Sequence, residues 1–338
     1  MRNDTRRLFN AYVSALAQLN GVDNAMQSFS VDPSVQQTLE DRIQESSAFL
    51  QRVNMMGVGQ QAGAKIGLGV GSPIAGTTNT ATTDRTTSDP AELDENGYFC
   101  TQTNFDTHLT YAKLDAWRKF QDFQVRIRNM IIQRQALDRI MIGFNGTSRA
   151  ATSDRVANPM LQDVNKGWLQ KIREFAPQRV LDEVIAASGE VTYGAGGDYA
   201  NLDAIVYDAV NNLIEPWYQE DTEMVAICGR SLMHDKYFPL VDSEQAPTEQ
   251  LARDIIISQK RIGGLPAVRV PFFPANAVMV TRLDNLSIYW QEETRRRTIV
   301  DNAKRDRIEN FESSNEAYVI EDYGSSCLIE NINPYEAP

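Results

Sequence analysis

Apolar side chains recur every three or four residues in several segments of the chain, and this spacing predicts amphipathic helices. The longest such segment covers residues 114–141, with Trp117 and Ile127 on its apolar side. At about 1.5 Å per residue this helix would span about 40 Å, roughly the width of a domain. The same spacing predicts further helices over residues 1–20, 33–49, 167–175, 201–214, 231–237 and 251–259.

Short apolar runs in the second half of the chain predict β-strands. These runs cover residues 224–228, 267–270, 277–280, 286–290, 297–300, 317–320 and 327–332. A glycine-rich stretch over residues 188–198 precedes them and is typical of turns at a domain boundary. Helices and strands together predict an α+β fold.

A long polar stretch, residues 57–97, precedes the longest helix. Seven glycines lie between residues 57 and 76, and seven threonines lie between residues 77 and 87. Alternating apolar positions on both sides of the threonines predict two strands, so we expect a long two-stranded hairpin with a threonine-rich tip. Unstructured stretches beyond about 12–15 residues are uncommon unless they are functional or disordered.

Ordering this hairpin would be costly for a single subunit. Fixing about 30 residues costs about 1–2 kcal/mol each in backbone entropy, and few of its side chains are apolar. We therefore predict that the hairpin is either mobile or held by another chain. A merely disordered surface loop is the alternative.

The N-terminal helix is predicted to be detachable. Its apolar stripe, which includes Phe9 and Tyr12, needs a partner, and residues 21–32 follow it as a linker. The linker closes on Asp32-Pro33, where the proline disfavours helix at the preceding residue. An exposed linker of this kind is a good site for a protease.

Composition limits the classes of function. The chain has 338 residues, enough for about two domains, and a net charge of −12, which opposes tight binding to nucleic acid. No apolar run approaches the ~18 residues that would span a bilayer, so we expect no membrane contact. Without a targeting segment the protein is expected to be made in the cytoplasm. The three cysteines are expected to be buried and reduced.

Candidate chemistry is sparse. Of the two histidines, His108 lies in a predicted strand and is expected to be solvated or packed, whereas His234 follows Ser231 at a spacing that lets the two side chains touch on a helix. Asp235 points elsewhere and cannot orient His234. A cytoplasmic α/β hydrolase is the enzyme alternative. No spacing predicts a metal or cofactor site.

The basic cluster at Arg295, Arg296 and Arg297 allows two interpretations. Acidic residues nearby make nucleic-acid docking less favourable than salt bridging. The cluster is either a solvated hairpin tip or a set of ion pairs between subunits.

Longer stretches of sequence indicate a family. They are FNAY (9–12), QESS (44–47), QDFQ (121–124), RIRN (126–129), GFNG (143–146), NPMLQD (158–163), NNLIEPWYQED (211–221), ISQKRIG (257–263) and LPAVRVP (265–271). From Met1 to about Asn333 the chain resembles the major capsid proteins of contractile-tailed temperate bacteriophages of the Peduovirus type. Runs of this length are far more specific than any short motif.

The resemblance implies the Hong Kong 97-type capsid fold, an α+β fold with an N-terminal arm, an extended hairpin loop, a long spine helix, a peripheral domain and an axial domain. The implied divisions are a trimmed N-terminal helix and linker (1–31), an N-arm helix (32–56), the extended loop (57–112), the spine helix and peripheral domain (113–195), the axial domain (196–281), and peripheral strands with the C-terminus (282–338).

The resemblance also implies a function. The chain would assemble into pentamers and hexamers of an icosahedral head shell around the phage genome, with no cofactor and no catalytic residue. Its partners would be an internal scaffold, a prohead protease, a portal, decoration proteins and weakly held double-stranded DNA. Another head or tail component is the structural alternative.

Particular residues follow from the same resemblance. A maturation protease would cut near Phe29 and Ser30. The extended loop would contact a neighbouring subunit. The loop residues expected at that contact are Ser72, Thr78, Thr83 and Arg85.

Overall fold

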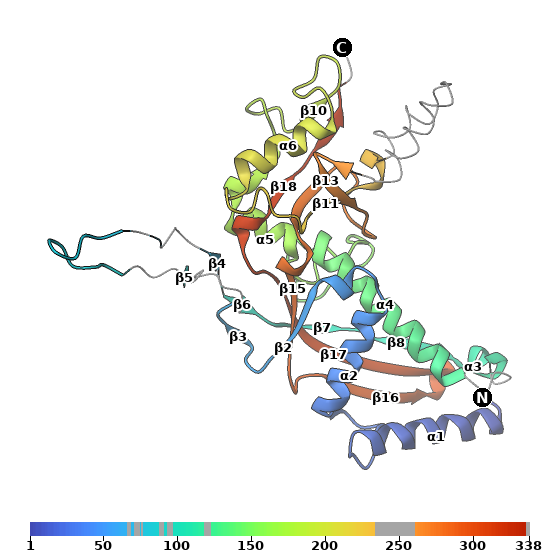
Figure 1. Cartoon of the computed structure of the whole chain (residues 1–338). Helices are drawn as coiled ribbons and strands as arrows, with labels where there is room; N and C mark the ends of the chain where they lie inside the picture. Colours follow the sequence, from blue (N-terminus) through green and yellow to red (C-terminus); the bar gives the residue numbers. More distant parts are fainter. Residues whose placement is uncertain are drawn as a thin grey trace, which may run out of the picture.

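The computed structural model describes residues 1–65, 69–70, 75, 77–87, 91–92, 97–117, 123–233 and 261–335. Figure 1 shows two lobes, with a narrow loop that projects sideways from the region between them. One lobe contains α1, α2, α4 and the strands β15–β17, and the other contains α5, α6 and the strands β11, β13 and β18.

A seven-stranded sheet organises the first lobe. Its order is β1-β16-β17-β15-β2, and β7 and β8 also pair with β17. The strands are β1 (Phe29–Ser30), β2 (Asn54–Val58), β7 (Thr101–Asn104), β8 (Thr107–Thr110), β15 (Leu286–Gln291), β16 (Arg296–Asn302) and β17 (Arg307–Ile320). The central strand β17 is 14 residues long, although the sequence predicted only its last four, because its first part is polar.

Four helices accompany this sheet: α1 (Asn3–Leu19), α2 (Pro33–Glu45), α3 (Tyr111–Trp117) and α4 (Phe123–Asn145). Asp32 caps helix α2 at its N-terminus, and its Oδ1 accepts a hydrogen bond from the backbone N of Ser34 at 2.9 Å, as is usual for a capping residue. The long helix predicted over residues 114–141 is represented by α3 and α4. Helix α4 is followed directly by Gly146. A Cβ at this position would lie 2.1 Å from the carbonyl oxygen of Asn165, so a larger residue would clash there.

The second lobe contains a six-stranded sheet in the order β12-β13-β11-β14-β18-β9. Its strands are β9 (Val180–Leu181), β11 (Met224–Cys228), β12 (Arg261–Ile262), β13 (Leu265–Val268), β14 (Val278–Arg282) and β18 (Cys327–Ile329). Alternate residues of β11 enter two apolar clusters, Ile227 with α5 (Trp168–Phe175) and Ala226 with α6 (Leu202–Leu213). The sheet is therefore covered on both faces.

The last strands lie in the second lobe. Strand β18 pairs antiparallel with β14, and β19 (Ile332–Pro334) pairs with β10 (Val191–Tyr193). The sequence grouped residues 282–338 with the peripheral strands. In the structure, residues 327–329 pair with β14 of the buried six-stranded sheet, and the division itself stays a prediction.

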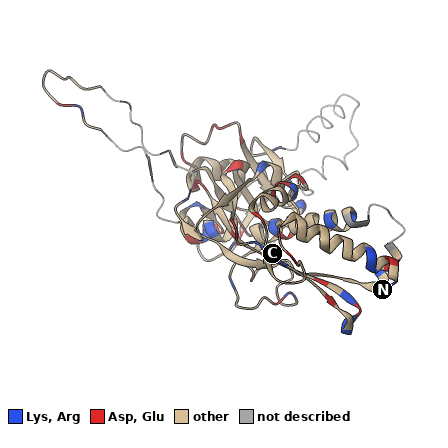
Figure 2. Cartoon of the chain, turned by 90° about the horizontal axis from the view of Figure 1, so that it is seen from below, with Lys and Arg blue, Asp and Glu red and all other residues tan. Residues whose placement is uncertain are grey.

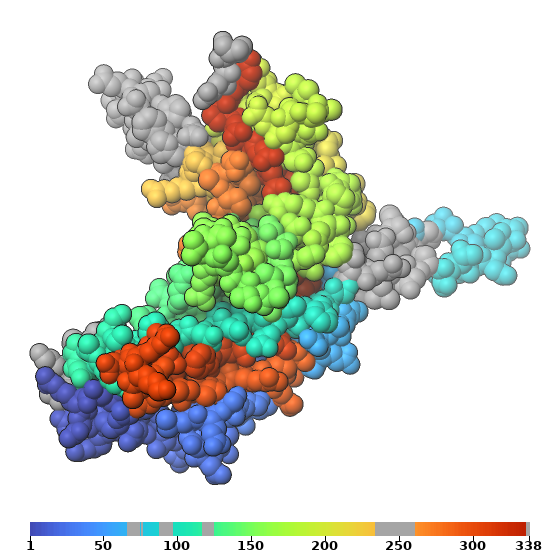
Figure 3. All heavy atoms as spheres, turned by 180° about the vertical axis from the view of Figure 1, so that it is seen from behind, coloured from blue at the N-terminus to red at the C-terminus, as the bar shows by residue number. Residues whose placement is uncertain are grey.

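The projecting loop is a hairpin wherever its strands are described. Strand β3 (Ala62–Gly63) pairs with β6 (Tyr98–Phe99), and β4 (Gly69–Val70) pairs with β5 (Ala91–Glu92), both antiparallel. Beyond β6 the chain leaves the hairpin and pairs with β17 instead. Figure 3 shows the far part of the loop standing clear of both lobes, and residues 77–87 are all exposed.

Aromatic packing anchors the root of this loop. The rings of Tyr98 and Tyr289 lie 5.0 Å apart, edge to face, and Val58 and Cys100 complete the same buried cluster. The loop is therefore fixed at its base, whereas its tip makes no core of its own. Ser72 lies outside the described residues, as do residues 234–260, which hold one predicted helix and most of another.

Candidate assembly surfaces and the ion network beneath them

The N-terminal helix lies along the first lobe with its apolar stripe inward. It packs against buried residues of α3, β16 and β17, so the partner that the stripe requires lies in the same chain. The residues that meet there are Phe9, Tyr12, Val13, Leu16, Tyr111, Leu114, Ile299 and Ile308.

Few polar contacts hold this helix. Arg6 forms an ion pair with Asp301, which also accepts a hydrogen bond from Tyr111, and Thr5 Oγ1 donates to Asp115 Oδ1 at 2.6 Å. Burial alone would raise the pKa of Asp301, but the hydrogen bonds from Tyr111 and Arg6 lower it below its ordinary value. The aspartate is therefore a charged anchor for α1.

Phe29 and Ser30, the predicted cleavage position, form an edge strand. They pair with β16 opposite Arg297 and Arg296, and the side chain of Phe29 is only 8% exposed. Most of the preceding residues 21–28 are exposed. A protease would reach the bond between Phe29 and Ser30 only after β1 leaves β16. The position of the cut stays a prediction.

Five charged side chains form a buried network between α2, α4 and β17. Arg139 Nη1 donates to Glu40 Oε2 at 2.5 Å and its Nη2 donates to Glu316 Oε1 at 2.6 Å. Arg295 Nη1 donates to Glu40 Oε1 and its Nη2 to Glu312 Oε1, both at 2.5 Å. These side chains are at most 3% exposed. Glu40 therefore lies between two arginines from different parts of the chain.

Two glutamates of the network have lowered pKa values despite their burial. Burial alone would raise the pKa of Glu312, but Arg295 and Arg297 lower it from 4.5 to about 2. Burial likewise opposes ionisation of Glu40, and Arg139 and Arg295 outweigh it, so the pKa of Glu40 is lowered. A buried ion pair adds little net stability over apolar residues of the same size. We infer that the network mainly fixes how α2, α4 and β17 fit together.

The three arginines of the basic cluster have separate roles. Arg295 is fully buried and pairs with glutamates of its own chain. The prediction of a solvated hairpin tip is therefore wrong for Arg295, and its guanidinium does not face a neighbouring subunit. Arg297 Nε donates to Asn310 Oδ1 at 2.8 Å and its Nη2 to Tyr12 Oη at 3.0 Å. Arg296 is exposed, and ion pairs between subunits stay a prediction for this residue.

The remaining candidates show no catalytic arrangement in the part of the chain that the structure covers. Ser231 Oγ donates to the carbonyl oxygen of Ala275 at 2.6 Å, and His234 lies outside the described residues. His108 is exposed on β8, as expected, and the three cysteines are buried and free, also as expected. Within the same residues, no cluster of potential ligands could hold a metal ion and no helix could cross a bilayer.

Charge is mixed over the surface. Figure 2 shows positive and negative residues interspersed on the helices and on the hairpin of β16 and β17, while the projecting loop carries little charge. Over the residues that the structure describes, this pattern offers no continuous basic face of the kind that nucleic acid requires.

Comparison with known proteins assigns the family. The family described as phage major capsid protein, P2 family, matches residues 8–332. The "Capsid proteins" of Escherichia phage P2 are 56% identical over 340 residues, covering 98% of this chain and 95% of the relative. The major capsid protein of Serratia phage KSP20 is 42% identical over 339 residues, covering 98% of this chain and 97% of the relative.

Solved structures agree with this family assignment. A chain of the satellite phage P4 procapsid, which includes the size determination (Sid) protein, matches with a TM-score of 0.84 and 54% identity over 99% of both chains. The capsid of an empty GTA particle shares the fold, with a TM-score of 0.54 and 15% identity over 85% of this chain and 90% of that one. The predicted Hong Kong 97-type α+β fold is confirmed. The chain belongs to the P2 family of phage major capsid proteins, which are structural proteins of the virion head and not enzymes.

Proposed function

We propose that this capsid protein closes into pentamers and hexamers, and that these join into an icosahedral shell around the genome. The observation that carries the proposal is the projecting hairpin, whose residues 77–87 are exposed and rest on no core of their own chain. A head-to-tail contact between identical subunits closes into a ring when its rotation allows. Each contact can be modest, because many contacts act together in a closed shell.

The tip of the hairpin is the proposed contact with a neighbouring subunit. The hydroxyl groups of Thr78 and Thr83 can donate and accept hydrogen bonds, and Arg85 adds a positive charge. Ser72 belongs to the same proposal. Because the root of the loop is fixed by Tyr98, the tip can reach another subunit without loosening its own.

We further propose that a prohead protease trims the N-terminal segment near Phe29 and Ser30. The support is the separate character of residues 1–31: α1 adds an outer layer to the first lobe (Figure 3), and β1 is an edge strand. The buried network begins only at Glu40, on α2, so the cut would leave it intact.

Domain names and partners are proposed by similarity. The six-stranded sheet with α6 would be the axial domain, and the seven-stranded sheet with α4 the peripheral domain. An internal scaffold, a portal and decoration proteins would join the assembly. Packaged DNA would touch the shell weakly and without sequence preference, since the net charge is −12.

Negative-stain electron microscopy of the protein co-expressed with its scaffold tests the proposal. We expect closed shells or ring-shaped capsomers. Intact-mass analysis of subunits from mature shells would give the trimming position. Strictly monomeric protein under all such conditions would overturn assembly by this chain.

A further inference from the structure

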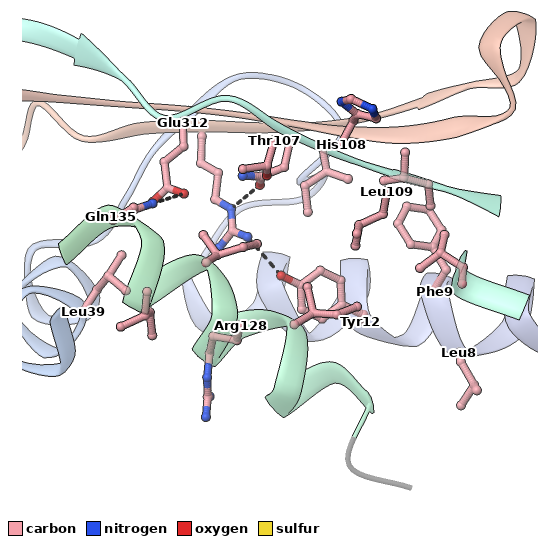
Figure 4. A pocket seen from close by; sticks show the side chains of 18 of the residues that line it. Leu8, Phe9, Tyr12, Leu39, Thr107, His108, Leu109, Arg128, Gln135 and Glu312 are labelled. Atoms are coloured by element: carbon pink, nitrogen blue, oxygen red, sulfur yellow. Dashed lines mark hydrogen bonds between the residues drawn. The ribbon is translucent and has the colours of Figure 1, made fainter. Parts of the chain in front are cut away.

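An apolar pocket lies under the N-terminal helix. Its volume is about 110 Å³, it is partly open to solvent, and it is lined by side chains from α1, α2, α4, β8, β16 and β17. Its apolar lining includes Leu8, Phe9, Leu39, Leu109, Ile127, Ile131, Ile299 and Ile308. Figure 4 shows these walls, with α1 on one side and α4 on the other.

The polar side chains at its rim are engaged with one another. Arg297 bonds to Tyr12 and Asn310, and Gln135 Nε2 donates to Glu312 Oε2 at 3.2 Å. Figure 4 shows His108 and Arg128 turned away from the pocket. The pocket therefore offers mainly apolar contact to a guest.

Size and lining define the guest. A closed apolar cavity of about 150 Å³ lined by aliphatic and aromatic side chains takes up benzene, and this partly open pocket has a similar lining and a somewhat smaller volume. A void of this kind leaves its lining without contact atoms on one side, and a guest of matching size restores them. A charged guest would lose its hydration without compensation.

We propose that this pocket binds a neutral molecule with a single aromatic ring, and that its occupation holds α1 on the body. Two of its walls, Leu8 and Phe9, belong to α1, whereas Leu109, Ile127 and Ile299 belong to the body. A guest that touches both sides adds contacts only while α1 is docked. Binding therefore favours the docked state by mass action.

Fluorobenzene tests this with the full-length, unassembled subunit. We expect it to slow hydrogen exchange of the α1 amides about tenfold at about ten times its Kd. Benzoate, which has the same ring and a charge, is expected to leave exchange unchanged. Equal exchange with and without fluorobenzene would overturn the proposal.

A variant that fills the pocket provides the second experiment. Leu109→Phe places a ring where the guest would lie, so exchange of α1 should no longer respond to fluorobenzene. Ile185→Phe, the same kind of change at a position that is 66% exposed outside the pocket, should respond as the natural protein does. If Leu109→Phe fails to fold, Ile127→Phe at a half-buried lining position replaces it. An undiminished response in the folded filling variant would assign the effect to another site and overturn the proposal.

Discussion

Arg139 on α4 donates hydrogen bonds to both carboxylate oxygens of Glu40 on α2, at 2.5 and 3.1 Å, and neither side chain reaches solvent. This pair joins the arm that follows the predicted trimming position to the long helix of the first lobe. The shape of the subunit around its assembly surfaces therefore depends on a few buried charges.

Replacing Arg139 should be costly. Arg139→Met would leave Glu40 and Glu316 buried with one cation fewer, and breaking a buried ion pair costs about 3–5 kcal/mol. Chemical denaturation of the unassembled subunit measures this loss. Arg134→Met is the matched control, because Arg134 lies on the same helix, is 55% exposed and pairs with Asp138. Arg134→Met should lower the free energy of unfolding by less than about 1 kcal/mol. Equal losses in the two variants would show that the buried network stabilises the subunit no more than a surface ion pair does.

The network also predicts how stability depends on pH. The pKa of Glu312 is lowered from 4.5 to about 2 in the folded state. A lowered carboxyl pKa contributes stability that is complete above the unfolded value and is lost as the pH falls toward the folded value. The free energy of unfolding should therefore be level from neutral pH to about pH 5 and fall below that.

The variant Glu312→Gln isolates this contribution. It should be less stable than the natural protein near neutral pH, yet lose less further stability between about pH 5 and pH 3. Glu45→Gln, at an exposed position on α2, should follow the natural curve. Parallel acid transitions for the natural protein and Glu312→Gln would contradict the assignment.

Helices and strands with a regular pattern of apolar residues could be predicted from the sequence, whereas the buried ion network could not. Helices α5 and α6 bury apolar residues that recur every three or four positions, and β11 is apolar throughout. The start of β17 is polar because Glu312 and Glu316 point inward to arginines. Buried Glu and Arg are rare, and nothing local marks them.

The projecting hairpin and strand β1 also differ in whether the sequence predicts them. The hairpin could be predicted, because an apolar deficit over residues 57–97 is visible in the sequence. Strand β1 could not, because its two residues gain their pairing from β16, more than 260 residues further on. A local pattern cannot report a contact whose second half is so distant.

Asp301 should control how firmly α1 is held. Asp301→Asn removes the charge that pairs with Arg6 and accepts from Tyr111, and hydrogen bonds to charged groups contribute about 1.5–3 kcal/mol. We expect α1 to detach more often, so limited proteolysis between residues 20 and 30 should be at least about tenfold faster. Asp23→Asn, an exposed change in the linker itself, should leave the rate nearly unchanged. An unaltered rate in Asp301→Asn would show that Asp301 does not hold the helix.

Shortening the hairpin should separate folding from assembly. Residues 77–87 are exposed and contact no core, so their deletion should change the free energy of unfolding by less than about 0.5 kcal/mol. The removal of Ser72 to Thr87 is expected to have the same effect. Either deletion should block the formation of stable shells, because the proposed contact with a neighbouring subunit is lost. Replacing the eleven residues by glycine and serine keeps the reach but removes Thr78, Thr83 and Arg85. If that variant assembles, reach alone is sufficient, and if the deletion itself assembles normally, the hairpin has no part in the contact.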